Sequence, residues 1–62
     1  MIQKVDLRLV SRQTVARAKV VTYYAEEALN AKNEAERVMY LSHAIEGIEA
    51  LIKTKEILEG TI

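Results

Sequence analysis

The chain has 62 residues with nine basic and nine acidic side chains, so its formal net charge is zero. Half of its residues are hydrophobic, and it contains no cysteine, proline, tryptophan or phenylalanine. These figures exclude two separate cores, a disulfide-bonded miniprotein and a cysteine-ligated zinc module, and they predict a single small domain over residues 1–62.

Residues 1–6 lack the apolar stretch of a secretory signal, and charges recur too often for a run of about 18 apolar residues. We therefore expect a cytoplasmic protein with no membrane partner. A chain of this size buries only about 60% of its surface on folding, so its hydrophobic gain barely offsets the lost chain entropy. Without disulfides or an evident metal site, oligomerisation is the expected source of further stability.

Residues 2–10 alternate between apolar and charged side chains, with Val5, Leu7 and Leu9 as apolar members. A period of two is typical of a half-buried strand, so the pattern predicts a short extended segment or strand. A helical arrangement of the same residues remains the alternative.

A first helix is predicted over residues 12–30, with Ser11 as its N-cap. Its apolar residues gather on one face at 100° per residue, and a smaller apolar stripe lies on the opposite side. A helix that is apolar on two sides normally packs against two neighbours. The residues of the smaller stripe are Ala16, Val20, Tyr24 and Ala31.

Residues 30–33, Asn-Ala-Lys-Asn, predict a turn between two helices. Asn33 followed by Glu36 resembles a capping box at the start of the second helix. One continuous helix is the alternative, because no glycine or proline interrupts the sequence here.

A second helix is predicted over residues 34–59, with Gly60 at the left-handed stop position. Large aliphatic residues on it repeat at intervals of three and four, which is the seam of a coiled coil. We expect this isoleucine stripe to close an antiparallel hairpin against small residues of the first helix, such as Ala18 and Ala25. The residues of the isoleucine stripe are Val38, Leu41, Ile45, Ile48 and Ile52.

The apolar surface of these elements exceeds what one hairpin can bury. The expected fold is therefore all-α or mainly α, with a short N-terminal extended segment or strand and an antiparallel helical hairpin that assembles as a homodimer. Whether such dimers go on to form a tetramer stays open. The residues expected in the dimer interface or core are Val20, Tyr24, Tyr40, Ala44, Leu51, Ile52 and Leu58.

No arrangement of residues indicates catalysis. His43 is the single histidine, and although Glu46 three residues later could share a metal with it, a lone histidine on a polar face is more typical of a surface. The two glycines, Gly47 and Gly60, form no phosphate-binding loop. We expect no enzyme activity and no catalytic, cofactor or metal site. Gly47, in mid-helix, either admits a closely approaching helix or is simply tolerated.

The zero net charge is a cancellation. Residues 1–20 have a balance of +4 and residues 21–62 a balance of −4. The basic end could meet an anionic partner or the acidic end of a second copy, although both could also be ordinary solvated surfaces. The candidate partner contacts are Lys4, Arg8, Arg12, Arg17 and Tyr23.

A strand with alternating basic residues followed by two helices resembles the ribbon-helix-helix repressors. The resemblance covers residues 2–48 and concerns layout rather than a motif. It implies that strands of two chains pair and enter the DNA major groove, and that helix 1 begins against phosphate. The residues it assigns to DNA are Lys4, Asp6, Arg8, Ser11 and Arg12.

Two functions follow as hypotheses. The first is a small non-enzymatic interaction protein (an inhibitor, adaptor or regulator) that binds itself and another protein as a helical homo-oligomer. The alternative is a DNA-binding transcriptional regulator that uses the basic N-terminal segment.

Overall fold

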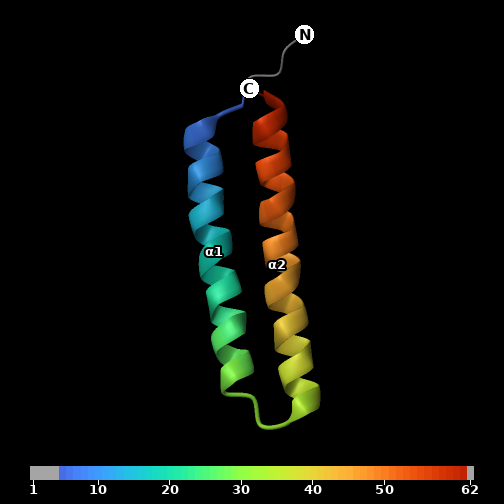
Figure 1. Ribbon diagram of the computed structural model, residues 1–62. Coiled ribbons are helices and arrows are strands. Elements are labelled where there is room, and N and C mark those ends of the chain that lie inside the picture. Colours follow the sequence, from blue (N-terminus) through green and yellow to red (C-terminus); the bar gives the residue numbers. More distant parts are fainter. Residues whose placement is uncertain (1–4, 62) are drawn as a thin grey trace.

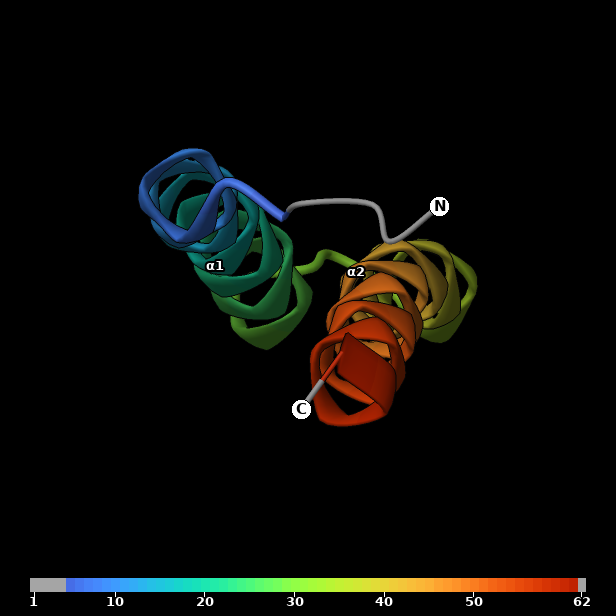
Figure 2. The same ribbon diagram turned by 90° about the horizontal axis from the view of Figure 1, so that it is seen from above.

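The computed structural model describes residues 5–61, which form two long helices joined by a short turn (Figure 1). Helix α1 spans Leu7–Leu29 and helix α2 spans Glu34–Thr61. They run antiparallel and lie side by side in both views (Figures 1 and 2). The chain is a rod of 51 × 17 × 13 Å. The predicted antiparallel hairpin is confirmed.

Helix α1 begins earlier than the sequence pattern predicts. Asp6 is its N-cap, and one carboxylate oxygen accepts the backbone N–H groups of Arg8 and Leu9, both at 3.1 Å. The predicted strand is therefore wrong for residues 7–10, which are helical, while residues 2–4 lie outside the described residues. A short alternation of residue types does not outweigh a cap that pairs two of the unpaired N–H groups of the first turn.

Ser11 is not the N-cap that we expected. It lies inside α1, and its hydroxyl donates to the backbone carbonyl of Leu7 at 2.8 Å. Asp6 is the N-cap instead of Ser11, and its carboxylate is also favoured by the positive end of the helix dipole.

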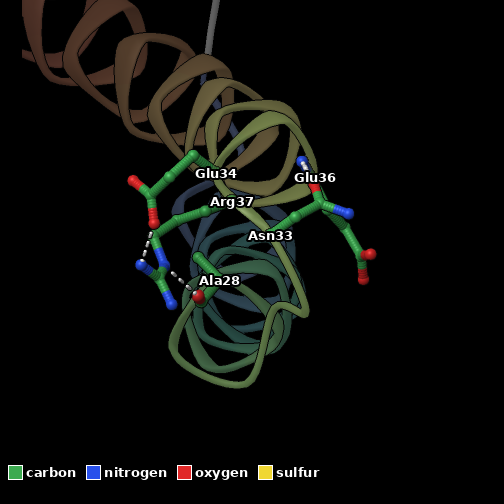
Figure 3. A network of polar contacts seen from close by, with 5 residues as sticks. All are labelled: Ala28, Asn33, Glu34, Glu36 and Arg37. Carbon is green, nitrogen blue, oxygen red and sulfur yellow. Dashed lines mark hydrogen bonds and ion pairs between the residues drawn. The ribbon is translucent and has the colours of Figure 1, made fainter.

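The turn lies where it was predicted. α1 ends at Leu29, and Asn30 donates both its backbone N–H and its side-chain amide to the carbonyl of Glu26, at 3.2 and 3.0 Å. Asn33 then caps α2, because its side-chain oxygen accepts the backbone N–H of Glu36 at 2.8 Å (Figure 3). The N-cap role of Asn33 is confirmed.

Arg37 ties the two helices together at this turn. Its Nε donates to the carbonyl of Ala28 at 3.0 Å, and its Nη1 pairs with Glu34 at 2.5 Å (Figure 3). The carbonyl belongs to the last turn of α1, where backbone acceptors have no partner within the helix. A cation from α2 thus satisfies the negative end of α1.

Helix α2 does not stop at Gly60. It continues through Thr61, and neither glycine of the described residues has a positive φ. The predicted left-handed stop is wrong, because Gly60 has a helical backbone. It lies in the last turn of α2, in which Leu58 is half-buried.

The helices meet along a line of small side chains. Within the described residues the buried hydrophobic side chains are Ala28 and Ala44, with 3% and 4% of their surface exposed. Farther along, Val21 packs onto Gly47 so closely that a Cβ atom there would lie 2.5 Å from the valine Cγ2. The structure therefore supports the close-approach interpretation of Gly47.

The hairpin does not close along the isoleucine stripe, contrary to the prediction. Its five residues are between 42% and 61% exposed. Helix α2 carries two seams, and a single neighbouring helix can cover only one of them. The seam with Ala44 and Gly47 lets the backbones come closer, so α1 packs there and the bulky stripe stays outside.

Candidate functional site

The isoleucine stripe is the most conspicuous exposed feature of α2. At 100° per residue its mean direction lies about 110° around the helix from the seam that faces α1. The stripe repeats at three and four residues over four helical turns. It therefore has the spacing needed to receive another helix.

Helix α1 carries a matching second stripe, about 100° around from its own seam with α2. All of its residues are exposed except Ala25, which is half-buried. The residues of this small-residue stripe are Ser11, Val15, Ala18, Thr22, Ala25 and Leu29.

Both stripes lie on the same side of the hairpin. Viewed from its own N-terminus, each helix has its stripe rotated in the same sense from the seam. Two antiparallel helices are related by a two-fold axis perpendicular to the plane that contains them. Because each stripe is offset from its seam by a similar angle in the same sense, both stripes lie on one side of that plane. We call the two stripes together the apolar face.

The two halves of the apolar face differ in relief. The half on α2 is built of leucine, valine and isoleucine side chains, whereas the half on α1 is floored by Ala18 and Thr22. An open hollow of about 500 Å³ lies over these two residues and Val15. Lys19, Tyr23 and Glu26 also line this hollow. One half is thus a ridge and the other a trough.

Charged residues border the apolar face along its two outer edges. The edge on α1 is mainly basic, with Arg8, Arg12 and Lys19, all of them exposed. The edge on α2 is mainly acidic, because it carries the exposed carboxylates of Glu49 and Glu56 with Lys53 between them. The two edges therefore have opposite charge over the half of the hairpin that is remote from the turn.

A groove of about 640 Å³ lies between the helices on the other side of the hairpin. Its aromatic wall is the pair Tyr24 and His43, whose rings are tilted by 33° with centroids 5.1 Å apart. The residues that line this groove are Gln13, Ala16, Arg17, Val20, Tyr24, His43, Glu46 and Gly47.

The groove contains one pair of a histidine and a carboxylate. His43 Nδ1 lies 3.8 Å from a carboxylate oxygen of Glu46. Within residues 5–61 these two residues are not joined by a third histidine, cysteine, aspartate or glutamate to form a group that could hold a metal ion. Both side chains are exposed, as ordinary surface residues are. The arrangement can make polar contacts with a bound molecule.

Tyr40 has a displaced pKa. Burial raises the pKa of its phenol above the ordinary value of 10.0, and the negative charges of Glu36 and Glu27 raise it further. The ring also lies 6.3 Å from that of Tyr24. Both effects favour the neutral phenol over the charged phenolate.

The residues predicted for the dimer interface or core fall into three places. Val20 is exposed and lines the groove, and Ile52 is exposed on the apolar face. The others are buried or half-buried on the seam side of their helices. These are Tyr24, Tyr40, Ala44, Leu51 and Leu58.

The predicted partner contacts are similarly divided. Arg8 and Arg12 lie on the basic edge of the apolar face, whereas Arg17 lines the groove. Tyr23 is 57% exposed and stacks edge-on against Tyr24 at 5.4 Å. Lys4 lies outside the described residues.

The sequence analysis did not identify the charged edges of the apolar face. It also did not identify Val15, Ala18 and Thr22 as one continuous surface. The signal was present, because these three residues repeat at intervals of three and four. Lys19 directly follows Ala18, and Glu49 directly follows Ile48, so each charged residue lies about 100° around its helix from the neighbouring stripe residue. Ala18 was expected to pack inside the hairpin, and Thr22 was not counted with it because threonine has low hydrophobicity.

Comparisons of the chain with protein-family models, with curated proteins and with solved structures find no match. No helix within the described residues is long and apolar enough to cross a membrane. The assignment of function therefore depends on the apolar face and the groove.

Proposed function

We propose that this chain is a small interaction protein that works by binding protein, beginning with further copies of itself, and performs no chemistry of its own. The observation that carries the proposal is the exposed isoleucine stripe of α2. Monomeric proteins rarely leave a contiguous apolar surface of this kind in water. Covering it would stabilise the protein by about 25 cal/mol for each Å² of apolar area removed from water.

The total exposed surface supports the same conclusion. The chain exposes 5455 Å². A compact protein of 7.0 kDa exposes only roughly 4,000 Å². The excess is nearly twice the roughly 800 Å² that one partner contributes to a standard protein–protein interface.

The spacing of the stripe defines the shape of its occupant. Side chains at intervals of three and four form a row of knobs and holes that fits another helix. Recognition through an amphipathic helix in a groove uses these same intervals. The partner surface is therefore helical.

The groove on the other side is the surface that we assign to a different protein. It stays accessible when the apolar face is covered, since the two lie on opposite sides of the hairpin. Arg17 and Tyr24 offer a cation and an aromatic ring there, and both residue types are enriched where proteins bind one another. An adaptor, inhibitor or regulator would use it in this way.

Sedimentation equilibrium at micromolar concentration tests the proposal. We expect a particle of at least twice the chain mass. Ile45→Glu should raise the dissociation constant at least about a hundredfold, because an unpaired carboxylate would be buried at the centre of the apolar face. Met39→Glu is the matched control, since Met39 is also about half exposed but lies outside both seams of α2. A fully helical 7 kDa species at every concentration would overturn the proposal.

The DNA-binding alternative gains no support from the fold. It requires an extended segment over residues 2–10 to enter the major groove, and α1 already begins at Leu7. Arg8 and Arg12 lie on a helix that continues into the hairpin. We therefore carry no second function forward.

A further inference from the structure

We infer that the apolar face is covered by a second copy of this chain, around a two-fold axis that runs parallel to the helices. In this arrangement α1 of each hairpin packs antiparallel against α2 of the other, and the product is a four-helix bundle. The inference rests on the proposed function and deepens it, because it names the partner and its orientation.

The exposed area fits a second copy. A compact protein of twice the chain mass exposes roughly 6,700 Å². Two chains that each expose 5455 Å² must therefore bury roughly 4,000 Å² between them to become equally compact. Permanent homodimers bury about 2,000–5,000 Å² in total. One dimer interface is enough to remove the excess.

Symmetry leaves two ways to stack the apolar faces of two identical hairpins. The two-fold axis must lie in the plane between the faces, and it runs either along the helices or across them. An axis along the helices brings α1 of one copy onto α2 of the other. An axis across the helices brings α1 onto α1 and α2 onto α2.

The relief of the apolar face favours the first arrangement. The trough over Ala18 and Thr22 then receives the ridge that carries Ile45 and Ile48 of the second copy. Large side chains opposite small ones fill the space between helices at native density. In the second arrangement two ridges would collide and two troughs would leave a void, and both defects are destabilising.

The register follows from the symmetry without further adjustment. A rotation about an axis parallel to the helices moves no residue along that axis, so each residue keeps its height. Within one hairpin Val21 lies beside Gly47 and Tyr24 beside Tyr40. Ala18 of one copy consequently lies level with Ile48 of the other. The predicted pairing of small with large residues is thus made between chains.

Charge selects the same arrangement. The basic edge of α1 comes to lie along the acidic edge of α2 from the second copy. At equal heights Lys19 meets Glu49, and Arg12 meets Glu56. With the axis across the helices, the basic edges would face each other and so would the acidic ones. Opposite charges at a rim mainly decide the orientation of an interface rather than its strength.

Spin labels in the turn distinguish the two arrangements. Lys32→Cys gives one label per chain, because the sequence has no other cysteine, and Lys32 is exposed. The inferred bundle has both turns at one end, so the pulsed electron resonance distance between labels should be under about 25 Å, given neighbouring helices 8–10 Å apart. A distance of about 40 Å, the length of a 28-residue helix, would place the turns at opposite ends and overturn the inference.

Charge reversal gives an independent measurement. Lys19→Glu should raise the dimer dissociation constant about tenfold at low salt, because two symmetric pairs become repulsive. Adding Glu49→Lys to the same chain should return it to within about threefold of the wild-type value, and Lys32→Glu in the turn is the control for net charge. If Lys19→Glu leaves the dissociation constant unchanged, α1 does not face α2 and the inference fails.

The outcomes separate this inference from the proposed function. If the wild-type chain does not associate at all, both are wrong. If it associates and Ile45→Glu prevents this, but the labels are far apart, the apolar face still mediates binding and only the orientation is wrong.

Discussion

The Cγ2 methyl group of Val21 lies 2.5 Å from the position that a Cβ atom of Gly47 would occupy. At this level of the hairpin α2 has room for a hydrogen atom and nothing larger. Contacts this short force neighbouring atoms to move, and a helical valine has one strongly preferred rotamer and cannot turn aside easily. The pair therefore sets the distance between the helices.

Gly47→Ala should not give the gain of about 1 kcal/mol that replacing a mid-helix glycine normally gives. Crowding against Val21 should cancel it or reverse it by about 1 kcal/mol. In the background Val21→Ala, the same change should stabilise the protein, so the two substitutions should be coupled in a double-mutant cycle of urea unfolding.

Gly60→Ala is the matched control for this cycle. Gly60 also lies within α2, but a Cβ atom there would meet nothing within 4 Å. Its replacement should stabilise the protein in either background. A full gain from Gly47→Ala alone would show that the helices are not held together by this contact.

Asp6→Ala should fray the first turn of α1 and lower the free energy of unfolding by about 1 kcal/mol. Its carboxylate accepts the N–H groups of Arg8 and Leu9, so amide hydrogen exchange at these two residues should accelerate. Ser11→Ala is the contrasting variant, and it should have a small effect because its hydroxyl only donates back to Leu7 within the helix. The reverse order of effects would restore Ser11 as the start of the helix.

Arg37→Ala should destabilise the turn by about 1–2 kcal/mol, because it removes a hydrogen bond from a charged donor to the carbonyl of Ala28. Arg37→Lys keeps the charge near the end of α1 but cannot bond Ala28 and Glu34 at the same time with a planar fork. We expect it to recover about half of the loss in thermal unfolding. Equal stability of the alanine variant and the wild type would mean that this exposed network contributes nothing.

The stability of the hairpin should fall at alkaline pH through Tyr40. Its pKa is raised in the folded chain above the unfolded value of 10.0, so folding favours the neutral phenol. The contribution is fully present below pH 10 and is lost as the pH rises through the folded-state pKa. Tyr40→Phe should flatten this fall, as measured by urea unfolding over the alkaline range, whereas Tyr23→Phe should leave it in place.

The two helices and their turn could be predicted because long periodic patterns and a local cap determine them. Asn33 sets the start of α2 through a hydrogen bond within three residues. The start of α1 was harder, because Asp6 stands in a short alternating segment that suits a strand equally well. Which cap acts depends on which backbone N–H groups are left unpaired, and residue types alone do not show this.

The packing seam could not be predicted from hydrophobicity. The heptad of large aliphatic residues on α2 is its most apolar stripe, yet Ala44 and Gly47 face α1 instead. Hydrophobicity ranks residues by area, whereas contact between two helices also depends on how near their backbones come. The candidate site was thus present in the sequence, but it was assigned to the inside of the chain.

If the chain associates as proposed, the alanine seam between the helices makes its stability depend on its abundance. Ala28 and Ala44 are the buried hydrophobic side chains of the described hairpin, so a chain without a partner would have little to resist unfolding and proteolysis. Association stabilises only folded chains, and the folded fraction therefore rises with the total amount present. Under this scheme a fall in synthesis, or dilution, would shift the protein toward dissociated and unfolded chains.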